Sequence, residues 1–350
     1  MRSALALLCL AWIWPGLALG WGADLHALVD WQARRDARAA GQAGGPVLTG
    51  LDLQAYLAGA PGPDLWYTAG YAGVTIPPGI EEDGEYVRLL VARSLTVREL
   101  SFALGYHGHI LGDGPGHRIY ISPHGDAARH LVRDASLAFS LLGEHEGYPQ
   151  LSCPLELLLG WGLDAEPGAW SWGTFDDGLL ALMQRAADDW CAARGGGEGC
   201  PVTLETLGKL RAQMLAANND AVSALTFPFA WGDDRRTLEL AQMVRALDEA
   251  EFGPGQGPAL LSEAVAASAE EVRLGVFSDE VRAWLEASDA PAAEVQRLLE
   301  GPPPDGQDEL EHPGGQDADA GCASAGQAVG QGLALGLLAL GLLGRGRRGP

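Results

Sequence analysis

"TVRELSFALGYHGHILGDGPGH", residues 96–117, combines a helix-start signal with a concentration of histidine and aspartate. Thr96 and the glutamate three positions later form a capping-box pattern, which predicts that a helix begins here. An apolar run follows, and the "GPG" of residues 114–116 predicts that the helix ends directly after Asp113. We therefore expect His117 on a loop, from which it could turn back toward the end of the helix.

Seven of the eight histidines lie in the first half of the chain, and three of them open an H-x-x-x-D pattern. Residues four apart on a helix lie on one face, about 6 Å apart. An imidazole nitrogen and a carboxylate oxygen placed in this way can reach one zinc ion. A single pair is more typical of a surface hydrogen bond, but three pairs in one chain indicate a metal site. The pairs are His26 with Asp30, His109 with Asp113, and His130 with Asp134.

His107 is expected to lie outside such a site. It precedes His109 by two positions, and two residues on a helix differ by about 200° in direction. We expect its side chain to be exposed or to lie behind the metal ligands.

The rest of the chain is predominantly helical in pattern, so the fold class that we predict is all-α, for one domain over about residues 21–300. The best candidate for a short strand is "HRIYIS", residues 117–122. The expected helices cover about residues 24–40, 51–60, 96–113, 126–142, 154–162, 175–194, 203–217, 234–251, 258–272, 278–288 and 290–300.

The chain is strongly acidic, with a formal net charge of −23 over 350 residues. Such a surface repels nucleic acid unless metal ions or a local basic patch intervene, so a nucleic-acid partner is not expected. Cys191 and Cys200 flank a glycine-rich loop that a disulfide could close in an exported protein. Cys153 would then be a free thiol.

Both ends of the chain have the composition of targeting segments. Residues 1–20 carry Arg2, an apolar run and a small-residue cleavage pattern, which predicts a secretory signal peptide. Cleavage would leave Trp21 as the first residue. Residues 301–321 are rich in proline, glycine and acids, which predicts a disordered linker.

Residues 322–350 combine Cys322, an apolar run and a terminal arginine cluster. This arrangement resembles the MYXO-CTERM sorting tail, which implies lipid anchoring or processing near the cysteine and display at the cell surface. The alternative is an ordinary C-terminal membrane anchor. In both cases we expect an exported protein that contacts the membrane through its tail.

"FALGYHGHILGDGPGH" resembles the core motif of the zinc-dependent phospholipase C/D family, an apolar helix followed by H-x-x-x-D-x-x-x-H. The short spacing before the last histidine is similar to the branch that includes glycosylphosphatidylinositol phospholipase D. "AYLAGAPGPDLWY" is similar to the family's G-x-x-x-PD segment, which points to Asp64. The resemblance covers about residues 21–142, and it implies the compact multi-helix fold of these enzymes.

The resemblance implies a cluster of two or three zinc ions and hydrolysis of phospholipids or other phosphodiesters by a zinc-activated water. Asp113 would bridge two ions and Asp64 could act as general base, so these are the two candidate catalytic residues. Trp66, Tyr67 and Tyr71 either line an apolar mouth for a lipid or pack in the core. The implied metal ligands are Trp21, through its backbone amine and carbonyl, His26, Asp64, His109, Asp113, His117, His130 and Asp134.

The chain departs from the family pattern at two points, one of which is the unusually flexible "GPG" between Asp113 and His117. Residues 65–106 contain no histidine, whereas the phospholipase C branch has a further one in this interval. One alternative is therefore a non-catalytic, surface-anchored binding module on a decayed phospholipase fold. The other alternative is a single-strand-specific zinc nuclease, because "WGADLH" is similar to the start of those enzymes, which share the all-α fold.

Overall fold

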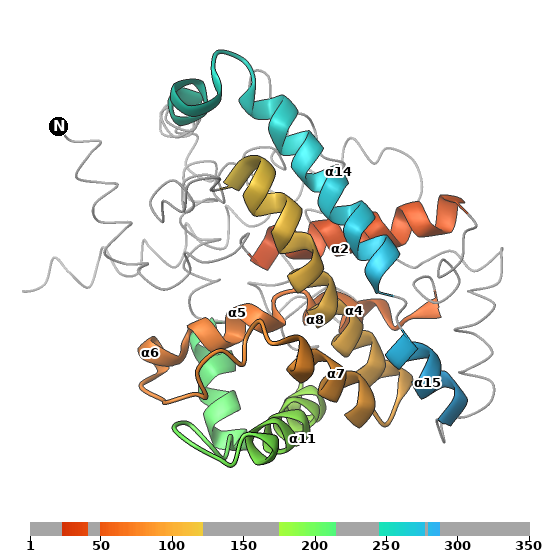
Figure 1. The fold of residues 1–350 in the computed structure, drawn as a ribbon, viewed down its shortest axis with the longest axis vertical. Coiled ribbons are helices and arrows are strands. Elements are labelled where there is room, and N and C mark those ends of the chain that lie inside the picture. The colour runs from red at the N-terminus through yellow and green to blue at the C-terminus, as the bar shows by residue number, and fades with distance from the viewer. Residues whose placement is uncertain (1–22, 41–49, 122–174, 215–244, 277–278, 288–350) are drawn as a thin grey trace, which may run out of the picture.

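The computed structural model describes residues 23–40, 50–121, 175–214, 245–276 and 279–287 (Figure 1). These residues are 78% helical and contain no strand, so the all-α fold class is confirmed for this part of the chain. The expected signal peptide, linker and tail lie outside it, as do the helices expected at 126–142, 154–162 and 290–300. None of the described helices combines the length and the apolar character that crossing a membrane requires.

The described part of the chain is a series of helices, some of which are joined by short turns. Several match the expected ranges, whereas α5, α6 and α7 were not expected. They are α2 (Ala23–Ala40), α4 (Leu53–Gly59), α5 (Gly62–Tyr67), α6 (Ala69–Ala72), α7 (Gly84–Arg93), α8 (Val97–Gly116), a π-helix η1 (His117–Ile121), α11 (Asp177–Ala193), α14 (Gly257–Gly275) and α15 (Asp279–Ala287). Residues 204–214 and 245–252 are also helical.

The long helix α8 is the central element of the fold, and α2, α4, α7 and α14 all pack against it (Figure 1). It begins at the predicted capping box. The Thr96 hydroxyl accepts a hydrogen bond from the Glu99 amide at 3.1 Å, and the Glu99 carboxylate accepts one from the Leu95 amide at 2.6 Å.

The C-terminal end of α8 differs from the sequence-based expectation. The "GPG" does not end the helix: Pro115 lies inside it, and the His117 amide donates to the carbonyls of Asp113 and Gly114. The chain then continues as η1, so the strand expected at residues 117–122 is wrong. Proline removes one amide donor but suits helical φ, and the small neighbouring residues leave room for its ring.

Helix α14 covers this end of α8. The Ser268 hydroxyl donates to the Gly112 carbonyl at 2.7 Å, and Gly112 lies against Val29 of α2 and Val272 of α14. Within η1, the Tyr120 hydroxyl donates a hydrogen bond to the Asp248 carboxylate of the helical segment 245–252 at 3.2 Å. These contacts fix the segment that follows the predicted ligands.

Two glycines allow α4 and α8 to approach closely. A Cβ atom on Gly105 would lie 1.7 Å from the Tyr56 carbonyl oxygen, and one on Gly59 would lie 2.1 Å from the Phe102 carbonyl oxygen. Neither side has room for a methyl group, because both neighbouring atoms belong to the backbone. The separation of the two helices is therefore set by glycine.

A buried aromatic cluster joins α5, α7, α8 and α11. Trp66 donates from its indole nitrogen to the Tyr106 hydroxyl at 3.0 Å, and Tyr106 donates to the Glu81 carbonyl at 2.7 Å. Tyr86 packs edge-on against both rings and donates to the Met183 carbonyl at 3.1 Å. Trp66 is thus a core residue and does not line a mouth for a ligand.

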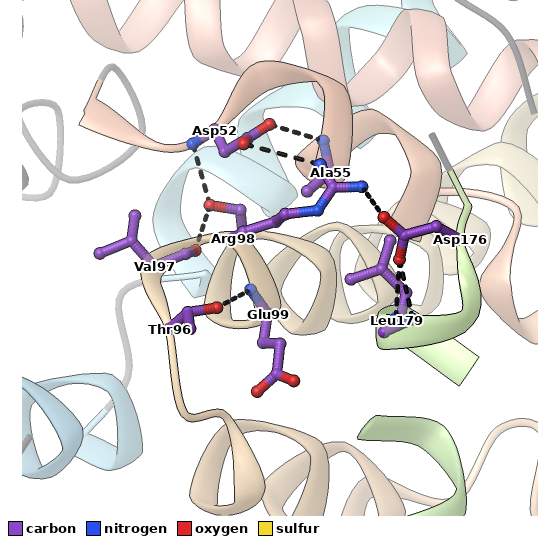
Figure 2. Close-up of polar contacts among 10 residues, drawn as sticks. Asp52, Ala55, Thr96, Val97, Arg98, Glu99, Asp176 and Leu179 are labelled. Carbon is purple, nitrogen blue, oxygen red and sulfur yellow. Dashed lines mark hydrogen bonds and ion pairs between the residues drawn. The ribbon is translucent and has the colours of Figure 1, made fainter. Parts of the chain in front are cut away.

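Arg98 joins the starts of three helices (Figure 2). Asp52 caps α4 by accepting from the Ala55 amide at 3.0 Å, and Asp176 caps α11 by accepting from the Leu179 amide at 3.1 Å. The Arg98 guanidinium lies 2.9 Å from Asp176 and 3.7 Å from Asp52. One arginine of α8 thereby holds two capping carboxylates in place.

The disulfide expected between Cys191 and Cys200 is present and closes the glycine-rich loop. The backbone of Gly199 in this loop packs against Ile76 and Pro77, since a Cβ there would lie 2.1 Å from the Ile76 carbonyl carbon. The disulfide therefore fixes a contact between two segments that are far apart in the sequence.

The α4–α8 contact generates a stability prediction. Gly105→Ala is expected to lower the free energy of unfolding by about 3 kcal/mol or more, or to prevent folding, because the added methyl group meets backbone. Gly114→Ala on the same helix is the matched control, since nothing lies within 4 Å of its added Cβ. Urea denaturation of the purified chain measures both. Equal stability of the two variants would contradict the close approach described here.

Candidate metal centre

Five of the predicted ligands converge at the C-terminal half of α8. His109 and Asp113 lie on α8 itself, His26 is on α2, Asp64 is on α5, and His117 opens η1. The residues come from three separate segments of the chain, and only the packing of α2 and α5 against α8 brings them together.

The donor atoms are separated by distances that suit a shared ion. His26 Nε2 lies 3.2 Å from Asp113 Oδ1, and His109 Nε2 lies 3.6 Å from Asp113 Oδ2. Two ligand atoms on one tetrahedral zinc, each about 2 Å from it, stand about 3.3 Å apart. The donor atoms of these three residues all lie within 4.8 Å of one another.

Two further residues lie beside this group. His117 Nε2 is 3.7 Å from Asp113 Oδ1, and Asp64 Oδ1 is 4.0 Å from His109 Nε2. Asp113 therefore presents one oxygen to His26 and His117 and the other to His109. This arrangement would allow its carboxylate to contact two ions at once.

The two innermost imidazoles are stacked. The ring centroids of His26 and His109 are 3.4 Å apart, and the ring planes differ by 17°. Both side chains are 1% exposed. Although His26 Nε2 and Asp113 Oδ1 are close, both are buried and neither has a hydrogen-bond partner among the described residues. Buried polar atoms of this kind are rare unless a ligand or water satisfies them.

The backbone of Ala60 sets the orientation of His109. His109 Nδ1 lies 2.6 Å from the Ala60 carbonyl oxygen, which can only accept a hydrogen bond. Nδ1 must therefore carry the proton, which leaves the Nε2 lone pair directed toward Asp113. A histidine whose second nitrogen donates to a carbonyl is the usual arrangement for a metal ligand.

Protonation states in the site also favour metal binding. Burial, together with the neighbouring charge of His26, lowers the pKa of His109 to about 3, so this imidazole is neutral at physiological pH. Burial alone would raise the pKa of Asp113, but the charges of His26 and His109 outweigh it and hold that pKa well below its usual range. The site thus offers a lone pair and a full negative charge, as metal ligation requires.

Asp30 is not part of the cluster, so the expectation that it shares a metal with His26 is wrong. Its carboxylate is fully buried and lies against Gly108, where a Cβ would be 2.3 Å from Oδ1. Burial raises the pKa of Asp30 well above its usual range. His107 also lies apart: it is half-buried, and burial lowers its pKa although the charge of Glu280 on α15 acts in the opposite direction.

Three predicted ligands, Trp21, His130 and Asp134, lie outside the described residues. The sequence analysis missed the role of the Ala60 carbonyl. A backbone acceptor leaves no trace in residue type, and the only signal was its place between α4 and the proline that follows it.

Comparison with known proteins adds no assignment: no family model, curated protein or solved structure matches this chain.

The site generates a prediction on metal content. His109→Gln is expected to reduce the divalent metal retained by the purified chain, because Gln cannot offer the oriented imidazole nitrogen. His107→Gln, two positions away on the same helix, is the matched control and is expected to retain the metal. Plasma mass spectrometry after dialysis measures both. Equal metal content in the two variants would contradict the assignment of His109.

A second prediction concerns pH. In the metal-free protein the folded pKa of His109 is below the unfolded value, so its contribution to stability is present above about pH 6.5 and is lost as the pH falls toward about 3. Asp113, whose pKa is also depressed, adds a further loss below about pH 4.

The free energy of unfolding should therefore fall on acidification from about pH 6.5, by up to about 1.4 kcal/mol per pH unit for one such group. His109→Gln should flatten this dependence between about pH 6 and 4.5. Urea titrations at a series of pH values measure it, and an unchanged slope in the variant would show that His109 is not held neutral.

Proposed function

We propose that this protein is an exported zinc-dependent phosphodiesterase that hydrolyses phospholipids. The observation that supports it best is the convergence of His26, His109 and Asp113, with Asp64 and His117 beside them, at separations suited to shared metal ions. The phospholipid substrate class rests on the resemblance of residues 102–117 and of the segment around Asp64 to the zinc-dependent phospholipase C/D family.

Zinc is the metal that the donor set favours. Imidazole nitrogens combined with carboxylate oxygens, in a buried site, are typical zinc ligands, whereas calcium and magnesium prefer all-oxygen sites. The Cys191–Cys200 disulfide supports export, because disulfides persist in oxidising compartments. Trp21, His130 and Asp134 are proposed to complete the ligand set for two or three ions.

The residues of the site have distinct roles in this proposal. Asp113 faces imidazoles on both sides with separate oxygens, so it would hold two ions together. His109 is kept in one tautomer by Ala60 and would bind without reorganisation. Bound zinc would supply a Lewis acid that lowers the pKa of water and neutralises charge on the phosphoryl oxygens.

Asp64 is proposed as the general base. Its carboxylate lies beside the His109–Asp113 pair at the edge of the group and is 8% exposed, whereas the two inner histidines are almost fully enclosed. A carboxylate in this position could accept the proton of the attacking water at Oδ1. The strongly acidic surface disfavours a nuclease on the same scaffold.

The test is hydrolysis of a short-chain, monomeric phosphatidylcholine by the secreted, zinc-loaded chain. Asp113→Asn is expected to lower the rate by about a hundredfold or more while leaving the helical circular dichroism unchanged. Removing a residue that supports a metal ligand lowers activity by about 10–100-fold, and removing a ligand itself should cost more. Asp279→Asn is the control, since that side chain is 95% exposed on α15.

Other outcomes would identify the alternatives. Hydrolysis of single-stranded oligonucleotides but not of phospholipid would indicate the nuclease. Absence of both activities in zinc-loaded wild-type protein would favour the non-catalytic binding module. Unchanged phosphodiesterase rates in Asp113→Asn would exclude this site as the catalytic centre.

A further inference from the structure

A long uncharged stretch follows the helix that carries Asp64. Residues 69–80, "AGYAGVTIPPGI", contain no charged side chain in a chain of net charge −23. They form α6 and the extended turn that leads to α7. We refer to residues 69–80 as the neutral loop. Acidic residues resume immediately after it, at Glu81, Glu82 and Asp83.

The neutral loop exposes one large apolar side chain, Tyr71, which is 46% exposed. Val74 and Ile76 are half-buried and pack against the core. Leu95, Leu204 and Leu274 are the other large hydrophobic side chains exposed in the described part of the chain. Unlike these isolated leucines, Tyr71 belongs to a continuous neutral segment.

Three contacts hold the backbone of the neutral loop in place. At its base, the Tyr67 hydroxyl donates to Glu82 at 2.5 Å, which links the residues before and after the loop. The Thr68 hydroxyl lies 3.3 Å from the Leu210 carbonyl. The disulfide-closed loop packs through Gly199 onto Ile76. These contacts hold the backbone that presents Tyr71.

The base of the neutral loop adjoins the candidate metal centre. Tyr67 lies one turn after Asp64 on α5. Burial and the hydrogen bond to Glu82 are the main causes that raise the pKa of Tyr67, and the charge of Asp64 adds to them. A surface that contacts the loop would lie close to a substrate at Asp64.

We propose that the neutral loop contacts the surface of a zwitterionic phospholipid bilayer and presents lipid to the site. This inference rests on the proposed function. Tyrosine favours the boundary between lipid and water, and small apolar side chains enter it at little cost. The absence of charge suits a neutral headgroup layer, and the acidic residues that follow would be repelled by an anionic one.

The first test is hydrogen exchange, followed by mass spectrometry, on the full secreted chain with and without phosphatidylcholine vesicles. The Asp113→Asn background prevents turnover. Amides of residues 69–80 are expected to gain protection, whereas those around Leu95, at the opposite end of α8 from Asp113, are not. This readout separates the loop from the predicted C-terminal anchor, which would bind vesicles without protecting the loop.

The second test compares Tyr71→Asp and Thr75→Asp with Leu95→Asp, a charge placed at a side chain that is 68% exposed. The two loop variants should lose the protection. In the active background Tyr71→Asp should lower the ratio of the vesicle rate to the monomer rate about tenfold or more, which is the cost of withdrawing one aromatic side chain from the bilayer surface. Thr75→Asp should lower the same ratio because it places a charge in that surface. Leu95→Asp should leave this ratio unchanged.

Several outcomes would overturn the proposal. These are an unprotected loop on vesicle-bound protein, protection only with anionic vesicles, or an equal effect of Leu95→Asp. Failure of the proposed function would differ, because monomeric substrate would then not be hydrolysed by any variant. If the loop is protected but the protein is inactive, the proposed membrane contact stands and only the presentation of substrate is excluded.

Discussion

Close packing of helices on the glycine-rich faces of α8 is the constraint on which the candidate site depends. Gly105 lies against the carbonyl of Tyr56 in α4, and one turn later His109 meets the carbonyl of Ala60 at 2.6 Å. Gly105 and His109 are four residues apart, as are Tyr56 and Ala60. The two contacts therefore lie about one helical turn apart. The helix spacing that glycine permits is therefore the spacing that lets a backbone carbonyl orient an imidazole.

A second glycine face of α8 does the same for α2. Gly108 and Gly112 receive Asp30 and Val29, which brings the preceding turn of α2, with His26, over His109. The two imidazoles are buried and the carboxylate is largely so; His109 is held by the Ala60 carbonyl, and His26 faces Asp113 at 3.2 Å. Buried charge is costly unless it is paired, so a cation bound at this place would stabilise the folded chain.

The sequence was sufficient to predict those features of the structure that depend on a local pattern. The capping box at Thr96, the disulfide at Cys191 and the grouping of histidines and aspartates are short-range patterns, and the structure places five of the eight predicted ligands together. It was insufficient where neighbours decide the outcome. Proline usually ends a helix, but Pro115 lies within α8, where α14 packs over the turn. Helix α7 was missed although Tyr86, Val87, Leu90 and Val91 recur at helical spacing.

The same distinction applies within the site. His26 and Asp30 are equivalent by spacing, yet only packing against Gly108 shows that Asp30 faces away from the metal ligands. The Ala60 carbonyl could not be identified from residue type at all. Side-chain chemistry can be read from a sequence, whereas backbone acceptors and the choice between two faces of a helix require the neighbouring helices.

The π-helix after α8 bears on which changes in chain length the candidate site can tolerate. A π-turn is wider than an α-turn by one residue, so it takes up an extra position without changing the helix before it. His109, Asp113 and His117 all precede or open this turn. One residue more or fewer within this turn would therefore shift the chain beyond it while leaving the spacing of His109 and Asp113 on α8 unchanged.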